Sequence, residues 1–327
     1  MSNKIQKIGV FTSGGDAPGM NAAIRAVVRA CAYYKKESYG IMRGYEGMIE
    51  GDLVKLGARS VGNILQRGGT ILKSARSEAF RTPEGRKKAY DNLKKEGIDA
   101  LIAIGGDGTF TGLHKFYQEY QIPSICIPGT IDNDLAGTDY TIGYDTATNT
   151  AVEAIDRIRD TALSHNRLFF IEVMGRNSGY IAINAGIAGG AVAMIIPEED
   201  TTFDQLFEML EENGKTSKKS NLVVVAEGSK IGGANELARK VAERSNYFDI
   251  KVTVLGHLLR GGPPTYFDRV LASKMGIAAV EGLFEGKNDV MVGIKDNKIV
   301  YNDFDTIMTQ HHEIEAEALR IAKILSI

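Results

Sequence analysis

Short apolar segments that end in polar, glycine-bearing loops constrain the fold of this chain most strongly. Ala100 to Ile104 is followed by Gly105-Gly106-Asp107-Gly108-Thr109, and Ile122 to Ile127 by Pro128-Gly129-Thr130-Ile131-Asp132-Asn133-Asp134. Apolar runs of this length are typical of buried strands, and Pro-Gly indicates a sharp turn where the second strand stops. Because sequential parallel strands usually lie side by side, we expect both loops at the carboxyl edge of one sheet, where such folds bind ligands.

Apolar runs and amphipathic segments alternate along the whole chain. Strands are predicted at residues 5–12, 38–43, 100–104, 122–127, 167–173, 191–196, 221–226, 251–255, 290–294 and 299–301. Helices are predicted from residue 20, at 83–97, from the glycine loop to residue 120, and at 146–164, 179–189, 203–214, 235–245, 265–285 and 313–325, with an irregular stretch at 44–57. This alternation predicts an α/β protein with two mainly parallel sheets and helices on both faces.

The charge balance excludes a ligand held by a global electrostatic field. The 327 residues include 39 Lys+Arg and 41 Asp+Glu, for a net charge of −2. Nucleic acid and membrane surfaces are therefore not expected partners, and any anion must be bound by a local cluster. No apolar stretch is long enough for a membrane span or a signal peptide, so we expect a cytoplasmic protein. Cys31 and Cys126 lie in apolar patterns and are expected to be core residues.

The first predicted strand is joined to its helix by Ser13-Gly14-Gly15-Asp16-Ala17-Pro18-Gly19. Glycines of this kind let a phosphate approach the backbone at a helix N-terminus. The segment matches neither the Walker A nor the Gly-x-Gly-x-x-Gly pattern, so the signal is weak by itself. On the helix that follows, Arg25 and Arg29 share one face, which is a solvated surface more often than a phosphate site.

The two strand-end loops carry the residue types that phosphoryl transfer requires. Gly106 and Gly108 would let phosphate oxygens touch the backbone, and Asp107 between them suits a magnesium ion held jointly with the phosphates. Similar segments occur in NAD kinases and diacylglycerol kinases, so this loop indicates only a phosphoryl donor. Asp132 and Asp134 could divide proton transfer and cation steering between them, or could simply form an Asx-rich turn.

Together these segments resemble the bacterial ATP-dependent 6-phosphofructokinases. The resemblance runs almost from end to end, through Thr12 to Asn21, Ile142-Gly143-Tyr144-Asp145-Thr146-Ala147, Glu172-Val173-Met174-Gly175-Arg176, Val254-Leu255-Gly256-His257 and Arg260-Gly261-Gly262. It implies two Rossmann-like three-layer domains with the active site in the cleft between them. Residues 1–143 plus 259–309 would bind ATP, and residues 144–258 plus 310–327 would bind fructose 6-phosphate. The implied glycolytic reaction transfers the γ-phosphoryl group of Mg-ATP to the 1-hydroxyl of fructose 6-phosphate.

The resemblance also implies a role for each residue at a motif position. The ATP site would comprise Gly15, Tyr45, Arg76, Ser77, Arg81, Gly106, Asp107, Gly108 and Thr109. Asp107 would hold Mg²⁺ there. Asp132 would accept the proton of the attacking hydroxyl and Arg176 would stabilise the transferred group, with Thr130 beside them as a third catalytic residue.

The acceptor sugar phosphate needs cations of its own. The matching positions are Thr130, Asp132, Asp134, Arg167, Met174, Gly175, Arg176, Glu227, Lys251, His257 and Arg260. In the family, the residues matching Arg167 and Lys251 reach across a subunit interface, which implies a homotetramer. An arginine is usual at Lys251, and lysine keeps the charge but loses bidentate phosphate geometry. We therefore predict weakened affinity for the sugar phosphate.

The resemblance also implies an effector site, where this sequence matches the family pattern less completely. In the bacterial family, ADP activates and phosphoenolpyruvate inhibits at a basic site between subunits. The matching or adjacent cations are Arg25, Arg29, Arg59, Arg159, Lys218 and Lys219. Three positions depart from the pattern, because Val192 replaces a magnesium-binding glutamate, Ala58 an arginine and Thr216 a lysine. We expect that an anion still binds, with weakened or altered regulation by ADP.

Other functions have recognisable sequence requirements. Pyrophosphate-dependent relatives carry an aspartate in place of Gly108 and a lysine in place of Gly129, and a side chain at Gly108 would intrude on the α-phosphate of ATP. A non-catalytic sugar-phosphate-binding regulatory subunit is disfavoured by Asp107, Asp132 and Arg176. A dinucleotide-binding dehydrogenase is disfavoured because Gly-x-Gly-x-x-Gly is missing.

Overall fold

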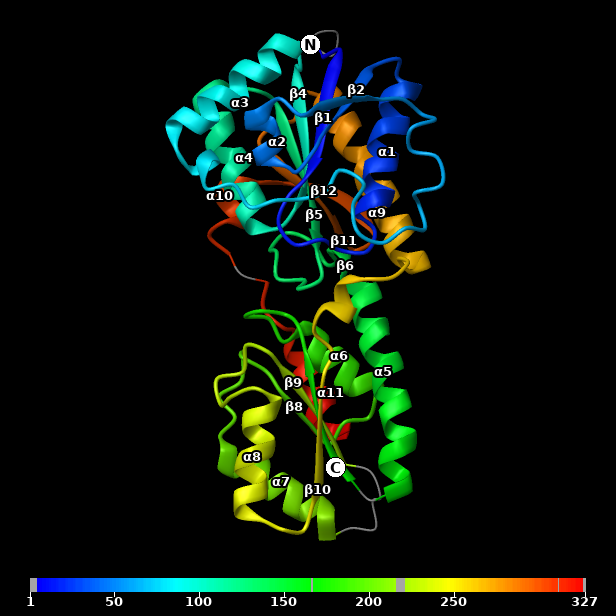
Figure 1. Cartoon of the computed structure of the whole chain (residues 1–327), viewed down its shortest axis with the longest axis vertical. Helices are drawn as coiled ribbons and strands as arrows, with labels where there is room; N and C mark the ends of the chain where they lie inside the picture. Colours follow the sequence, from blue (N-terminus) through cyan, green and yellow to red (C-terminus); the bar gives the residue numbers. More distant parts are fainter. Residues whose placement is uncertain (1–4, 166, 216–220, 311, 326–327) are drawn as a thin grey trace. The chain divides into compact units, whose positions relative to one another are not determined.

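A computed structural model describes residues 5–165, 167–215, 221–310 and 312–325. The chain divides into two compact units. Unit 1 takes in the described residues of Met1–Ile131, Leu135–Asp145 and Arg260–His312. Unit 2 takes in those of Asp132–Asp134, Thr146–Leu259 and Glu313–Ile327. The chain therefore passes between the units several times, and the colours in Figure 1 show blue and orange segments in the same unit.

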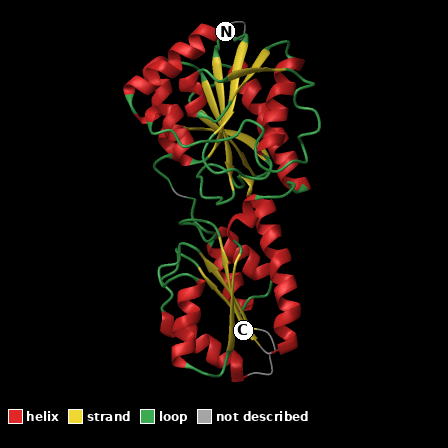
Figure 2. Cartoon of the chain, in the orientation of Figure 1, coloured by secondary structure: helices red, strands yellow, loops and turns green. Residues whose placement is uncertain are grey.

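Unit 1 is built on a sheet of eight described strands in the order β12-β11-β5-β4-β1-β2-β3, with β6 paired to β5. Figure 2 shows the strands in yellow with helices in red around them. The strands are β1 (Lys7–Thr12), β2 (Glu37–Ile41), β3 (Leu53–Leu56), β4 (Ala100–Gly105), β5 (Ser124–Thr130), β6 (Ile142–Gly143), β11 (Val290–Lys295) and β12 (Lys298–Asp303). The outer strands β3 and β12 pair antiparallel, and the central pairs are parallel. The carboxyl ends of β1, β4 and β5 therefore meet at one edge.

Helices cover both faces of this sheet. They are α1 (Met20–Tyr33), α2 (Tyr45–Glu50), the 3₁₀ turn η1 (Ala79–Arg81), α3 (Pro83–Glu96), α4 (Asp107–Tyr120), α9 (Tyr266–Phe284) and α10 (Phe304–Ile307). Helices α1 and α9 pack together on one face, and α2, α3 and α4 lie on the other (Figure 1). A core with Phe11, Leu93 and Phe116 fills the space under α3 and α4. Burial of such side chains contributes roughly 1.5–3 kcal/mol each.

Local sequence signals explain where the helices of unit 1 start and stop. The Thr82 hydroxyl accepts a hydrogen bond from the Gly85 N–H at 3.1 Å, and Pro83 occupies the first helical position of α3. Gly97 ends that helix with φ 71°, a left-handed conformation that glycine adopts without strain. Thr265 caps α9 in the same way as Thr82 caps α3.

Unit 2 has a parallel sheet of four described strands in the order β10-β7-β9-β8. The strands are β7 (Arg167–Val173), β8 (Ala193–Ile195), β9 (Asn221–Ala226) and β10 (Asp249–Val254). The helices are α5 (Tyr144–His165), α6 (Tyr180–Ala188), α7 (Phe203–Lys215), α8 (Ala234–Arg244), the 3₁₀ segment η2 (Gly256–Arg260) and α11 (Ala316–Leu325). The first two residues of α5 and the last residue of η2, Arg260, belong to unit 1. A core with Leu168, Leu206 and Leu237 lies between the sheet and helices α7 and α8. Right-handed crossover helices on both faces are usual for such sheets.

The predicted α/β architecture with two mainly parallel sheets is confirmed, and two local predictions are wrong. The stretch 44–57 is not irregular, because it forms α2, which packs on α3, and β3, which pairs with β2. Strand β5 does not stop at Pro128-Gly129, because Gly129 and Thr130 pair with Ile142 and Gly143 of β6. Within the described residues, no helix is both long and apolar enough to cross a bilayer. The thiols of Cys31 and Cys126 are buried, as expected of core residues.

Candidate active site

The glycine loops after β1 and β4 meet at the carboxyl edge of the unit 1 sheet. The Ser13 N–H donates to the Ile104 carbonyl at 3.1 Å, which ties the two strand ends together. A Cβ on Gly105 would lie 2.5 Å from the Ser13 oxygen, so only glycine allows this approach. Gly105 is also in register with Pro128 of β5. Strands β4 and β5 thus end at the same edge of the sheet, as the sequence predicts.

Helix α4 starts directly in the second loop. Gly106 is its N-cap residue, and Asp107 and Gly108 in the first turn are exposed. A Cβ on Gly108 would meet no atom within 4 Å, so open space surrounds this backbone. The first turn of a helix presents backbone N–H groups and the positive end of the helix dipole. The N-terminal end of α4 can therefore bind an anion, and the Asp107 carboxylate in the same turn can bind a cation.

Helix α2 contacts the first turn of α4, and the turn η1 packs against helix α2. Tyr45 is buried, and its hydroxyl donates to the backbone oxygen of Thr109. Its ring stacks on Phe80 of η1, with centroids 4.0 Å apart and an angle of 22° between the planes. Burial raises the pKa of Tyr45 well above its usual value. Tyr45, predicted to contact ATP, lies where it holds the first turn of α4.

The basic residues predicted for the nucleotide lie on exposed loops of unit 1. Arg76 is exposed, and the Arg81 side chain is 79% exposed, with a loose ion pair to Glu78 at 3.5 Å. The Ser77 hydroxyl accepts a hydrogen bond from the Phe80 N–H at 3.2 Å. Arg76 and Arg81 are therefore free of buried contacts that would prevent them from meeting a ligand.

Arg260 also belongs to unit 1. Its guanidinium donates to the Asp16 carbonyl at 3.2 Å, and a Cβ on Gly15 would lie 2.7 Å from its Nη1 atom. Arg260 is predicted to bind the sugar phosphate, but its guanidinium contacts the glycine loop that contains the nucleotide candidate Gly15. The structure thus groups Arg260 with the loop after β1.

The carboxylate loop lies in unit 2. Asp132 is only 4% exposed, and its carbonyl accepts a hydrogen bond from the Ser178 hydroxyl at 2.8 Å. Asn133 has φ 50°, a left-handed conformation that asparagine tolerates better than most residues. Asp134 is half-buried, and Thr130, at the end of β5 in unit 1, is buried. The loop is thus held at Asp132 itself by Ser178 of the same unit.

The turn at Arg176 is held by Glu227. One Glu227 oxygen accepts hydrogen bonds from the N–H groups of Gly175 at 3.1 Å and Arg176 at 2.8 Å. Arg176 has φ 53°, which costs a non-glycine residue roughly 1–3 kcal/mol and is common at functional sites. A Cβ on Gly228 would lie 1.8 Å from the Arg176 oxygen, so the next turn must be glycine. Glu227 therefore fixes the backbone that presents the exposed Arg176 side chain. Met174 lies half-buried beside this turn, and His257 is exposed on η2.

Arg167 lies at the other end of the same sheet, and Lys251 lies on the neighbouring strand in register with Phe169. Both contact Asp249, Arg167 at 2.8 Å and Lys251 at 2.7 Å. The two ion pairs lower the pKa of Asp249, with Lys251 as the larger cause. Arg167 begins β7 and Val173 ends it, so about 20 Å of strand separates Arg167 from the Arg176 turn. Among the described residues of unit 2, the ion pairs of these two cations are with Asp249 and not with the turn at Arg176.

The predicted effector cations fall in both units. Arg29, Ala58 and Arg59 line an open hollow of about 650 Å³ in unit 1. Arg25 is one turn before Arg29, and its pKa is lowered by burial and by the charge of Arg29. In unit 2, one Arg159 guanidinium nitrogen is buried without a hydrogen-bond partner among the described residues. Lys218 and Lys219, with Thr216, lie outside the described residues.

Val192 has the environment of a core residue. It is 5% exposed and packs with Leu168, Phe170 and Leu206. It also borders a cavity of about 430 Å³ under α7 and α11. Within the described chain, no group of three or more His, Cys, Asp or Glu side chains could hold a metal. The lining of the cavity is mixed, with apolar residues such as Val192 and Ile195 and charged ones such as Glu199, Glu212 and Lys323.

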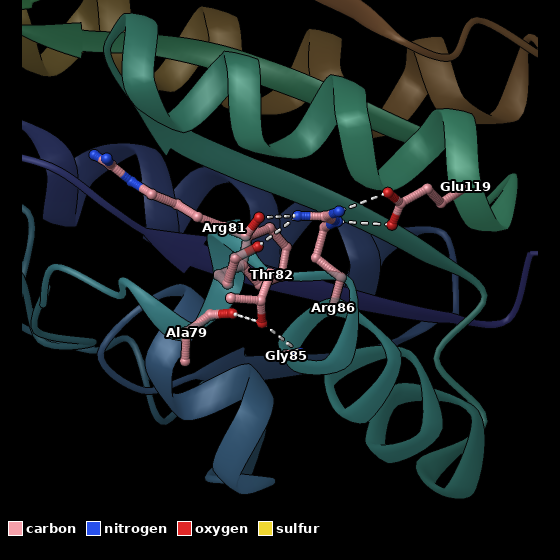
Figure 3. Close-up of polar contacts among 7 residues, drawn as sticks. Ala79, Arg81, Thr82, Gly85, Arg86 and Glu119 are labelled. Atoms are coloured by element: carbon pink, nitrogen blue, oxygen red, sulfur yellow. Dashed lines mark hydrogen bonds and ion pairs between the residues drawn. The ribbon is translucent and has the colours of Figure 1, made fainter.

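Sequence reasoning missed Arg86 and Glu119, and Arg86 bonds to the backbone of the nucleotide candidate Arg81 (Figure 3). Arg86 is 3% exposed and makes a two-pronged ion pair with Glu119, with both contacts at 2.7 Å. In the sequence it is one of three consecutive basic residues of a polar helix, Arg86-Lys87-Lys88. Nothing in that run distinguishes the buried cation from its exposed neighbours.

The comparisons agree with the resemblance seen in the motifs. The sequence profile described as "Phosphofructokinase" matches residues 7–283. The chain is 55% identical over 322 residues to the ATP-dependent 6-phosphofructokinase of Cytophaga hutchinsonii, covering 98% of both chains. It is 54% identical to the ATP-dependent 6-phosphofructokinase 1 of Thermus thermophilus, covering 99% of this chain and 100% of the relative.

Solved structures share the fold. The phosphofructokinase of Saccharomyces cerevisiae matches 98% of this chain with a TM-score of 0.87 and 36% identity. This chain spans 46% of the yeast chain. The pyrophosphate-dependent phosphofructokinase of Marinobacter aquaeolei matches with a TM-score of 0.87, 98% of this chain and 91% of its own, but only 19% identity. The second likeness bears on the fold alone.

Proposed function

This chain belongs to the phosphofructokinase family, and from that premise we propose that it is an ATP-dependent 6-phosphofructokinase of glycolysis. It would transfer the γ-phosphoryl group of ATP to the 1-hydroxyl of fructose 6-phosphate, giving fructose 1,6-bisphosphate and ADP. The observation that carries this proposal is the full-length identity of 51–55% to relatives named for this activity. The glycine loop at α4 and the carboxylate loop at Asp132 supply matching chemistry.

The donor would bind at the carboxyl edge of unit 1. Gly15, Gly106, Gly108 and Thr109 would provide backbone contacts to its phosphates, and Arg76, Ser77 and Arg81 would provide side-chain contacts. The exposed Asp107 fits a magnesium ion that arrives with the nucleotide, because Mg²⁺ is commonly held by one or two carboxylates plus substrate phosphates. When bound, this ion neutralises phosphate charge. Tyr45 would position Thr109 from behind.

The acceptor would be activated by Asp132. A carboxylate within hydrogen-bond reach of the 1-hydroxyl can take its proton as the oxygen attacks phosphorus. Arg176, held by Glu227 through its backbone, would stabilise the charge on the transferred group. Asp134, Thr130, Met174, Gly175, Glu227 and His257 would complete the sugar site, with Arg260 as a further cation.

The open space at Gly108 supports ATP as the donor. A nucleotide needs room for its α-phosphate, and no atom lies within 4 Å of a Cβ built at this position. Gly129 is different, because a Cβ there would lie 3.0 Å from Ile104 and 3.3 Å from Met20. Gly108 rather than Gly129 would therefore decide between ATP and pyrophosphate.

A homotetramer would bring Arg167 and Lys251 to a sugar-phosphate site. Arg167 lies at the amino end of β7, about 20 Å of strand away from the Arg176 turn of the same chain. Lys251 lies on the neighbouring β10, in register with Phe169. A second copy could supply them across an interface. The homotetramer is a prediction, and so is the cytoplasmic location.

The effector proposal rests on the hollow lined by Arg29 and Arg59 and on the proximity of Arg25 to Arg29. An anion such as ADP or phosphoenolpyruvate would relieve the repulsion between these cations. Buried Val192 offers no oxygen ligand for a metal, so regulation by ADP should be weak or altered.

Initial rates test these proposals together. We expect turnover of fructose 6-phosphate with Mg-ATP and none with pyrophosphate. Sugar-phosphate binding without turnover would favour the non-catalytic regulatory subunit. Sedimentation velocity gives the oligomeric state. Rates repeated with ADP and phosphoenolpyruvate test the effector proposal, and a strong ADP response would contradict the inference drawn from Val192.

A further inference from the structure

The Arg86 guanidinium bonds to two backbone carbonyls of η1 as well as to Glu119. Nη1 donates to the Phe80 oxygen at 3.0 Å and to the Arg81 oxygen at 2.7 Å. Nε and Nη2 donate to the two Glu119 oxygens. One buried cation therefore joins the end of η1 to the far end of α4 (Figure 3). Its charge is compensated by the carboxylate and by both carbonyl dipoles, as a buried charge requires.

The turn between η1 and α3 leaves no freedom around this cation. The Thr82 hydroxyl donates to the Ala79 carbonyl at 2.7 Å and accepts from the Gly85 N–H at 3.1 Å. A Cβ on Gly85 would lie 2.0 Å from the Ala79 oxygen, so the helix approaches η1 as closely as glycine permits. Arg86 follows Gly85 directly. The backbone that carries the Arg86 side chain is thus held in place by these contacts.

A second connection runs from η1 to the beginning of α4. Phe80 stacks on Tyr45, and the Tyr45 hydroxyl donates to the Thr109 oxygen in the first turn. Arg86 and Glu119 secure the last turn of the same helix. The 3₁₀ turn that carries Arg81 is therefore fastened to both ends of α4, whose first turn holds Asp107 and Gly108.

We propose that Arg86 is a positioning residue for the nucleotide site, acting through the Phe80 and Arg81 carbonyls to place Arg81 relative to the first turn of α4. The inference rests on the proposed nucleotide site. The Arg81 side chain has only a loose ion pair to Glu78 among the described residues, at 3.5 Å. Its backbone is held on one side by its N–H, which donates to the Glu78 carbonyl at 3.1 Å, and on the other by its carbonyl, which accepts from Arg86 at 2.7 Å. A small displacement of a binding group is costly, because about 1 Å can change rates by two orders of magnitude.

The test compares variants that separate stability from position. Arg86→Met removes all four bonds and leaves Glu119 uncompensated. Arg86→Met with Glu119→Met removes both charges, and replacing a whole ion pair by apolar groups is often neutral for stability. The Phe80 and Arg81 carbonyls lose their donor in both variants. We expect the double variant to regain thermal stability while its KM for ATP stays raised by about tenfold or more.

Conservative variants and a matched control sharpen the result. Arg86→Lys keeps one charge but cannot serve the carboxylate and both carbonyls, so its KM for ATP should be intermediate. Glu119→Gln leaves the carbonyl bonds in place and should act mainly on stability. Asn302→Ala removes a 2.8 Å bond to the Gly137 carbonyl elsewhere in unit 1 and should leave both KM values within about twofold. KM for fructose 6-phosphate should stay within about twofold in every variant.

A KM for ATP that recovers together with stability in the double variant would overturn the proposal, because Arg86 would then be only structural. So would an unchanged KM in Arg86→Met. Calorimetric titration of the same variants with Mg-ATP measures the dissociation constant directly. Lack of turnover in the unchanged protein would refute the proposed activity, whereas unchanged ATP affinity in Arg86→Met would refute the positioning role alone.

Discussion

The two units present different chemistry at the carboxyl edges of their sheets. In unit 1, Gly108 opens onto space, and the backbone of the first turn of α4 is exposed around it. In unit 2, the N–H groups of Gly175 and Arg176 donate to Glu227, so they are not available to a ligand. The charged side chain of Arg176 is exposed instead. Unit 1 would thus select its ligand by shape and main-chain contacts, and unit 2 by side-chain charge.

This difference predicts different responses to substitution. A main-chain site fails when a side chain occupies its space, whatever that side chain is. A site made of charged groups should respond in proportion to the charge and geometry that are lost.

Loss of the Asp132 carboxylate should have the largest effect. Asp132→Asn keeps the shape and the bond from Ser178 to the Asp132 carbonyl, but it removes the proton acceptor. We expect kcat to fall by about two to four orders of magnitude with a smaller change in KM. Asp134→Asn is the neighbouring control and should cost less. A kcat within about tenfold of the original would contradict the assigned role.

A side chain at Gly108 should damage donor binding next most strongly. Gly108→Asp adds a negative charge where phosphate would lie, and like charges 4 Å apart repel by about 1–4 kcal/mol in water or near a protein surface. We expect KM for ATP to rise between about fivefold and a thousandfold. The melting temperature should not fall, because a Cβ at Gly108 meets no atom within 4 Å and a residue other than glycine favours the helix. Gly108→Ala separates bulk from charge, and unchanged KM values in both variants would refute a main-chain phosphate site.

Replacing Lys251 tests the graded response of the charged site. Lys251→Arg restores bidentate phosphate geometry, and one additional hydrogen bond is worth about 1 kcal/mol. The half-saturating concentration of fructose 6-phosphate should therefore fall by about two- to fivefold. Lys251→Gln should raise it. An unchanged or raised value in Lys251→Arg would contradict the predicted weakness of lysine at this position.

The smallest effect concerns the Asp249 carboxylate between Lys251 and Arg167. These cations hold the pKa of Asp249 below its ordinary value. A depressed folded-state pKa means that the contribution to stability is present above the unfolded value of about 3.9 and is lost as the pH falls through the folded value. The melting temperatures of the unchanged protein and Asp249→Asn should thus converge below about pH 4, and salt should narrow their difference at pH 7. A constant difference across this range would exclude the ion pairs as its source.

Much of the fold and the positions of the candidate loops could be predicted from the sequence. Strands β7 and β9 have the predicted bounds, because the apolar run of β7 stops shortly before Gly175 and that of β9 stops at Glu227. The start of α3 followed from Thr82 and Pro83, and its end from Gly97. The glycine loop before α4 and the carboxylates after β5 were found because backbone approach and proton transfer each require particular residue types.

Contacts between segments far apart in the sequence were decided only by the tertiary structure. Strand β5 continues through Pro128 because β6, more than ten residues later, pairs with its end. Tyr45 became a support for Thr109, and Arg86 a buried link to Glu119, through partners 64 and 33 residues away. Local composition carries the information for strands, caps and phosphate loops, because those depend on neighbouring residues. Which cation is buried, and which end of a sheet it occupies, depends on packing between distant segments, so only the folded chain reveals it.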